Sequence, residues 1–214
     1  MGAACGTGSG RKYEIAVAPD GAAGPIVDTS AAHSVEEAYE SAGAMSLREI
    51  KSRLDICSTT TVTVTAELTL TYAGLSQRGY YPRTPTKANQ DAFVVNTKDF
   101  GNNRALFGVF DGHGKDGDYV SGFIRDNLPA QIRKQLQSSP PSIEDAMEYA
   151  FEQTDEMCHC DQDILSGSTA ITVFFNGSKV HVANVGDSRA ILVTSDEKSK
   201  LKPVPLSYDQ TPYR

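Results

Sequence analysis

Short runs of β-branched and aromatic residues, several alternating with polar positions, recur along this chain and predict a fold rich in β-strands. The clearest alternation, of Leu against Thr, lies in the Thr-rich segment 59–72. Asn176-Gly177 separates two later runs and supplies the positive φ angles of a type I′ turn, so the last strands are expected to form an antiparallel meander. The predicted strands cover residues 59–72, 92–96, 104–110, 170–175, 179–184 and 190–193.

Apolar residues recur at helical spacing in two segments between these strands. The first covers residues 120–136, with a break expected at Pro129 because proline lacks the backbone N–H that a helix needs. The second is expected to begin at Ser142, a residue type favoured as an N-cap. Nearer the N-terminus, Ser34-Val-Glu-Glu and Ser46-Leu-Arg-Glu match the capping box and predict two short helices between residues 34 and 56.

Composition places the chain among globular proteins with an acidic surface. Its 214 residues include 39% hydrophobic residues, and its net charge of −7 argues against a broad nucleic-acid surface, which needs clustered basic charge. The four cysteines are too few for a secreted disulfide scaffold. We expect a flexible N-terminal extension at 1–33, a helical extension at 34–58 and one main domain at 59–214.

The N-terminal sequence bears on location. No run approaches the roughly 18 apolar residues of a membrane span, and no apolar signal-peptide core is present, so we expect a cytoplasmic or nuclear protein. The start Met1-Gly2-Ala-Ala-Cys5 resembles that of an acylated protein, but Gly6 stands where the motif has Ser or Thr. Membrane association through acylated Gly2 and Cys5 is therefore kept as an alternative.

The segment Asp111-Gly-His-Gly114, which follows an apolar strand, is the strongest candidate for chemistry. Gly112, Gly114 and Gly117 formally match a dinucleotide fingerprint, but the surrounding aspartates would repel a pyrophosphate. An EF-hand is disfavoured because His113 and Lys115 occupy positions that need oxygen ligands. Two interpretations remain, which are a hard-oxygen Mg²⁺ or Mn²⁺ site with His113 as a proton donor, and a Gly-Asp turn with a solvated histidine.

The Asp111-Gly-His-Gly114 segment belongs to a series of five sequence blocks. In chain order they are Asn89-Gln-Asp91, Phe107-Gly-Val-Phe-Asp-Gly-His-Gly114, Gly167-Ser-Thr-Ala170, Val182-Ala-Asn-Val-Gly-Asp-Ser-Arg-Ala190 and Leu206-Ser-Tyr-Asp209. With these blocks in this order, the chain resembles the metal-dependent PPM family, the type 2C protein Ser/Thr phosphatases, over roughly residues 70 to 212.

The resemblance implies an α+β fold, a four-layer α-β-β-α sandwich of two antiparallel sheets with two Mg²⁺ or Mn²⁺ ions at one edge. It implies that Asp111 bridges both ions, that Gly112 contributes a carbonyl ligand and that Asp91 supports the cluster through water. It further implies that His113 protonates the leaving Ser or Thr oxygen and that Asp187 binds a weaker third ion. The reaction implied is hydrolysis of phosphoserine or phosphothreonine on proteins by metal-activated water.

Three departures from the family pattern accompany the resemblance. Gln90 stands where many members have Glu, so ion binding is expected to be weaker. Many members have an arginine just upstream of that Glu, where it binds the substrate phosphate. This chain has no arginine there, which leaves Lys87 or Arg83 as candidates for that role. The family's later aspartates are absent, so residues 59–214 are expected to be the N-terminal part of a phosphatase domain that is incomplete at the C-terminus. The full-length protein is expected to be a monomer. A catalytically inactive interaction or regulatory module is the alternative.

Overall fold

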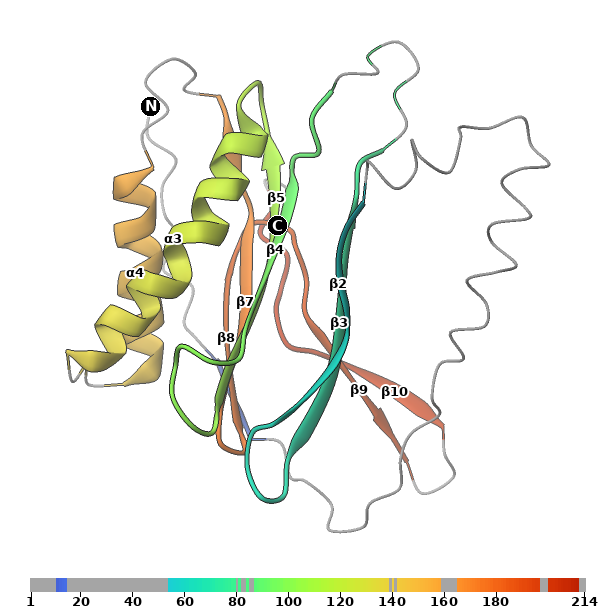
Figure 1. The fold of residues 1–214 in the computed structure, drawn as a ribbon, viewed down its shortest axis with the longest axis vertical. Coiled ribbons are helices and arrows are strands. Elements are labelled where there is room, and N and C mark those ends of the chain that lie inside the picture. Colours follow the sequence, from blue (N-terminus) through green and yellow to red (C-terminus); the bar gives the residue numbers. More distant parts are fainter. Residues whose placement is uncertain are drawn as a thin grey trace.

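The computed structural model describes residues 11–14, 54–79, 81, 84, 87–138, 140, 142–158, 165–196 and 200–211. The capping boxes at residues 34–37 and 46–49, with Gly2 and Cys5, lie outside these residues. Within them the structure combines antiparallel sheets with two helices (Figure 1). The α+β class expected from the sequence is therefore confirmed.

A six-stranded antiparallel sheet forms the centre of the structure (Figure 1). Its strands neighbour one another in the order β1, β8, β7, β5, β4, and β6 pairs with the end of β5. β7 and β8 form the hairpin predicted around Asn176-Gly177, with Gly177 at a φ of 63°. The strands are β1 Arg11–Glu14, β4 Asp91–Asn96, β5 Arg104–His113, β6 Gly167–Ser168, β7 Ala170–Asn176 and β8 Lys179–Val185.

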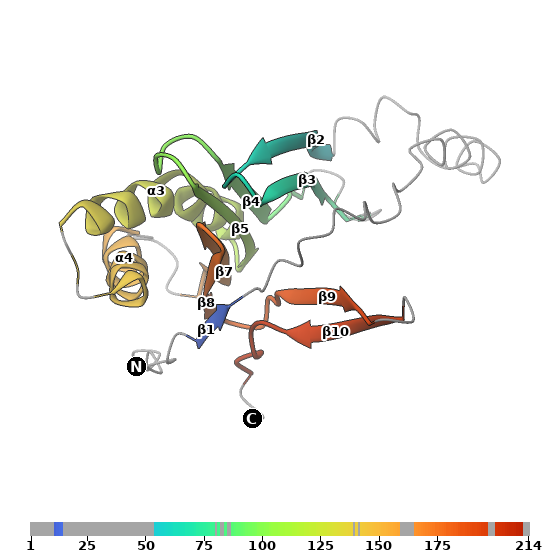
Figure 2. The ribbon, with the colours of Figure 1, turned by 90° about the horizontal axis from the view of Figure 1, so that it is seen from below.

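Two helices cover one face of this sheet (Figures 1 and 2). They are α3, Gly117–Gln137, and α4, Ile143–Met157. The Ser142 side chain caps α4 by accepting a hydrogen bond from the backbone N–H of Asp145, as the sequence predicted. The helices bury the alternate strand positions that face them, and the resulting core includes Leu106, Phe110, Phe174, Leu128, Ile132 and Met147.

Two separate two-stranded sheets lie on the other side of the central sheet (Figure 2). One pairs β2, Leu54–Thr63, with β3, Thr69–Gln77, and the other pairs β9, Ile191–Ser195, with β10, Leu201–Pro205. The Tyr72 ring on β3 packs edge-on against Phe107 of β5, with centroids 5.2 Å apart. Apolar contact thus covers part of the face away from the helices.

Several sequence-based predictions for the strands need correction. The predicted strand 59–72 is two strands, because the Thr65 hydroxyl accepts hydrogen bonds from the backbone N–H groups of Glu67 and Leu68 and forms a turn between them. β3 then extends to Gln77, into a segment expected to be turns. β9 does not continue the meander, since it pairs with β10 instead of β8.

The expected break at Pro129 is also wrong, because α3 continues through that residue. Proline inside a helix costs about 3 kcal/mol. The flanking side chains Leu128 and Ile132 are fully buried against the sheet, and burial of each contributes about 1.5–3 kcal/mol. Tertiary packing therefore outweighs the local preference.

Parts of the two predicted N-terminal extensions are strands. Residues 11–14, within the expected flexible segment 1–33, form β1 against β8. β2 begins at Leu54, within the expected helical segment 34–58. Among the described residues, no helix is both long and apolar enough to cross a membrane.

Candidate active site

Three polar side chains that the sequence analysis singled out lie at one end of the central sheet. Asp111 and His113 are exposed and alternate along β5 with the buried Phe110 and Gly112. Because side chains two positions apart share a face, both point away from the helices. Asp91, at the start of β4, is the cross-strand partner of Asp111 and therefore lies on the same face.

Asp91 and Asp111 form a close pair of carboxylates. The backbone N–H of Gly112 donates to the Gln90 carbonyl at 2.9 Å, so the neighbouring pair Asp91/Asp111 occupies a non-hydrogen-bonded position, where facing side chains are closest. Burial, the charge of Asp111 and a hydrogen bond with Asp111 all raise the pKa of Asp91. A bound cation would relieve this repulsion.

Gly112 lies in close contact with the first residue of α3 and with the residue before β4. A Cβ atom at this position would lie 2.0 Å from the carbonyl oxygen of Gly117 and 2.7 Å from that of Gln90. No side chain fits there without moving the backbone. The glycine therefore permits the strand to run directly into the loop that leads to α3.

The His113 ring lies over Gly167, its partner on β6. A Cβ atom on Gly167 would come within 2.8 Å of the imidazole Nε2. Glycine at residue 167 thus provides the space in which the imidazole lies. In the sequence, the Gly167-Ser-Thr-Ala block is recognisable only as part of a family pattern, because nothing local shows which residue it faces.

Thr169 connects the strand of Asp111 with the turn that carries Asp187. Its backbone N–H donates to the Asp111 carbonyl at 2.9 Å, and its hydroxyl accepts from the Asp111 backbone N–H at 3.0 Å. The same hydroxyl lies 2.6 Å from that of Ser188. Asp187 itself is exposed in the turn after β8, where Gly186 has a φ of 96°.

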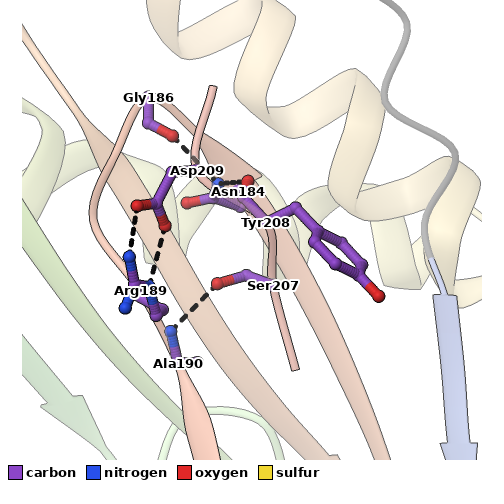
Figure 3. A network of polar contacts seen from close by, with 7 residues as sticks. All are labelled: Asn184, Gly186, Arg189, Ala190, Ser207, Tyr208 and Asp209. Carbon is purple, nitrogen blue, oxygen red and sulfur yellow. Dashed lines mark hydrogen bonds and ion pairs between the residues drawn. The ribbon is translucent and has the colours of Figure 1, made fainter. Parts of the chain in front are cut away.

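A polar network holds this turn against residues 206–210 (Figure 3). The Asn184 side-chain amide donates to the carbonyls of Gly186 and Tyr208, both at 3.1 Å. Arg189 forms a two-point ion pair with Asp209, with Nε to Oδ1 at 2.9 Å. This pairing raises the pKa of the Arg189 guanidinium. The Leu206-Ser-Tyr-Asp209 block therefore supports the turn that carries Asp187.

Of the two candidate phosphate-binding cations, the structure describes Lys87. The Lys87 ammonium lies over the Tyr81 ring, 4.3 Å from its centroid, and the Arg78 guanidinium donates to the Lys87 carbonyl at 2.8 Å. Arg83 lies outside the described residues. The structure therefore shows an aromatic contact for Lys87 and does not test either residue as a phosphate ligand.

The donor set only partly fits a binuclear metal centre. Two adjacent carboxylates are the hard oxygen ligands that Mg²⁺ and Mn²⁺ prefer, and the pKa shift of Asp91 records their proximity. However, no group of three or more His, Cys, Asp or Glu side chains that could hold an ion occurs among the described residues. Asp91 and Asp111 are brought together, whereas Asp187 does not join them in such a group.

Residues 88–214 match the family described as "Protein phosphatase 2C". Probable protein phosphatase 2C 35 of Arabidopsis thaliana is 44% identical over 151 residues, which are 68% of this chain and 42% of that protein. Probable protein phosphatase 2C 72 of the same plant is 35% identical over 139 residues, 58% of this chain and 41% of that protein. This chain thus spans about two fifths of the length of these relatives.

Among solved structures, one described as a C. elegans sex determining protein matches with a TM-score of 0.51 and 19% identity, over 75% of this chain and 36% of that one. At this identity the similarity concerns the fold alone. Serine-threonine phosphatase 2C from Toxoplasma gondii matches with a TM-score of 0.45 and 24% identity, over 57% of this chain and 46% of that one.

Proposed function

Because this chain belongs to the protein phosphatase 2C family, we propose that the protein hydrolyses phosphoserine and phosphothreonine on other proteins. The observation that carries the proposal is the placement of Asp91, Asp111 and His113 on one face at one end of the sheet. Paired carboxylates beside an imidazole are the groups that metal-assisted phosphate hydrolysis needs. The family is metal-dependent in general, and we propose Mg²⁺ or Mn²⁺ as the ions for this chain.

Each site residue has a proposed role. Asp91, Asp111 and the Gly112 carbonyl would hold the ions, with Asp187 as a ligand of a weaker third site. The chemistry that such ions supply when bound is acidification of the attacking water and neutralisation of phosphoryl charge. Lys87 is exposed and remains a candidate contact for the substrate phosphate, together with Arg83.

His113 is proposed to donate a proton to the leaving Ser or Thr oxygen. Its ring is exposed on the face of the carboxylate pair, and Gly167 leaves room for it. Imidazole exchanges protons near neutral pH, which suits a general acid in the cell. Proton donation lowers the barrier because the departing alkoxide would otherwise be a poor leaving group.

The test is metal-dependent hydrolysis of a phosphothreonine peptide by the full-length protein and two variants. Asp111→Asn removes the carboxylate that faces Asp91, and we expect it to lower kcat by on the order of 100-fold or more. Asp126→Asn makes the same chemical change on the exposed surface of α3, beside Arg125, and should leave kcat unchanged.

Full turnover by Asp111→Asn in the presence of Mn²⁺ would contradict this assignment of the site. A folded full-length protein with no metal-dependent hydrolysis would instead favour the inactive interaction module. No contact in the described residues favours that module over the phosphatase.

A further inference from the structure

The side chain of Gln90 binds the start of the loop that follows His113, the last residue of β5. Gln90 immediately precedes Asp91, and its Nε2 donates to the Gly114 carbonyl at 2.7 Å. Its own backbone carbonyl accepts from the Gly112 N–H at 2.9 Å. The two hydrogen bonds engage the residues on either side of His113 and so restrain the loop on both sides of the imidazole.

Three glycines make room for this arrangement. A Cβ atom at Gly117 would lie 2.7 Å from the Gln90 Nε2, and one at Gly112 would lie 2.7 Å from the Gln90 carbonyl oxygen. Gly114 adopts a φ of 85°, a conformation that favours glycine. The three glycines whose spacing resembled a nucleotide-binding fingerprint thus allow the loop to pack around the Gln90 carboxamide.

An amide and a carboxylate are not equivalent at this position. The contact with Gly114 needs a donor, because the partner is a carbonyl oxygen. An ionised glutamate would place an acceptor against that acceptor, so the hydrogen bond would be lost and replaced by repulsion. Gln90 is therefore chemically matched to the loop, beyond being a neutral replacement for an acidic residue.

We propose that Gln90 is a positioning residue that fixes the His113–Gly114 loop through its carboxamide. The proposal rests on the proposed function only in that His113 is the group positioned for proton donation. The restraint of the loop itself is a property of the metal-free protein. It can therefore be tested whether or not hydrolysis is observed.

The experiment compares Gln90→Glu and Gln90→Met with the wild-type full-length protein. Both variants keep a side chain of similar length and lose the amide donor. Gln137→Glu, at the exposed end of α3, is the matched control for the added charge. The first measurement is hydrogen–deuterium exchange of the amides of residues 113–118 in EDTA. The second is Mn²⁺ affinity by calorimetry, and the third is the separation of kcat from KM.

We expect exchange at residues 113–118 to rise about 3- to 10-fold in both Gln90 variants, as for the loss of one hydrogen bond, and not in the control. If the wild type is active, kcat should fall with KM little changed, because an imprecisely held His113 affects proton donation more than substrate binding. Unchanged loop exchange in both variants would overturn the proposal, and tighter Mn²⁺ binding by Gln90→Glu without a change in exchange would do the same. If the wild type proves inactive, the proposed function fails while the exchange measurement still decides the role of Gln90.

Discussion

Asp91 and Asp111 face each other across β4 and β5, and the charge of Asp111 contributes to raising the pKa of Asp91. Facing carboxylates destabilise a sheet unless a proton or a cation lies between them. The protein nevertheless places this pair at one end of the β4–β5 pairing in the central sheet. Such a pair is typical of a site that is completed by a cation.

The first prediction concerns the pH dependence of stability without metal. The pKa of Asp91 is raised above its ordinary value of 3.8, so between the two values the folded state binds more protons than the unfolded state. Asp91 should therefore lower the free energy of unfolding as pH rises from below 3.8 through the folded-state pKa. Asp111→Asn removes the repulsive part of the shift and leaves the part due to burial, so the decrease should be smaller in that variant.

Urea unfolding of both proteins in EDTA, between pH 3 and pH 7, measures this difference. Because part of the Asp91 residue is exposed to solvent, added salt should weaken the contribution that comes from the charge of Asp111. An identical pH dependence in wild type and variant would show that the two carboxylates do not interact.

The second prediction concerns the space at Gly112. Gly112→Ala would place a methyl group 2.0 Å from the Gly117 carbonyl oxygen, which must move together with the start of α3. We expect the free energy of unfolding to fall by about 1–3 kcal/mol, as for overpacking in a closed site. The control is Gly101→Ala, because no atom lies within 4 Å of a Cβ there, although its φ of 83° still adds some strain. Gly112 itself does not have a positive φ, so a loss in Gly112→Ala no larger than that in Gly101→Ala would contradict the importance of the close approach.

The third prediction concerns the hydroxyl of Thr169. Thr169→Val keeps the shape but removes the acceptor of the Asp111 backbone N–H, so we expect a loss of about 1–3 kcal/mol. Thr169→Ser keeps the hydroxyl and should recover most of that loss. Chemical denaturation measures both. A serine variant as unstable as the valine variant would show that the methyl group, and not the hydroxyl, is needed.

The fourth prediction concerns the network around Asn184. Asn184→Ala removes the amide that bridges Gly186 and Tyr208, so residues 206–210 should exchange amide hydrogens about tenfold faster. Exchange in α3 should not change. Arg189→Lys replaces the two-point contact with Asp209 by a single charge and should give a smaller increase in the same segment. Unchanged exchange at residues 206–210 in both variants would show that β9 and β10 hold the segment alone.

Local sequence patterns were sufficient for much of the fold. Apolar runs bounded by turn residues identified β4, β5, β7 and β8, and Asn176-Gly177 identified the hairpin between the last two. The motif order predicted the family, which the comparison over residues 88–214 confirmed. The prediction failed at Pro129, because the burial of Leu128 and Ile132 depends on a sheet that the helix sequence does not contain.

The candidate site shows the same contrast between what local sequence patterns predict and what depends on tertiary contacts. Residue type and motif alone predicted Asp91, Asp111 and His113 as candidate site residues. The folded structure was needed to show that Gln90 donates to a carbonyl 24 residues away and that the Thr169 hydroxyl accepts from a backbone N–H 58 residues away. Periodicity reports the face on which a side chain lies, whereas these contacts depend on strand register and chain reversal, which only packing of the whole sheet fixes.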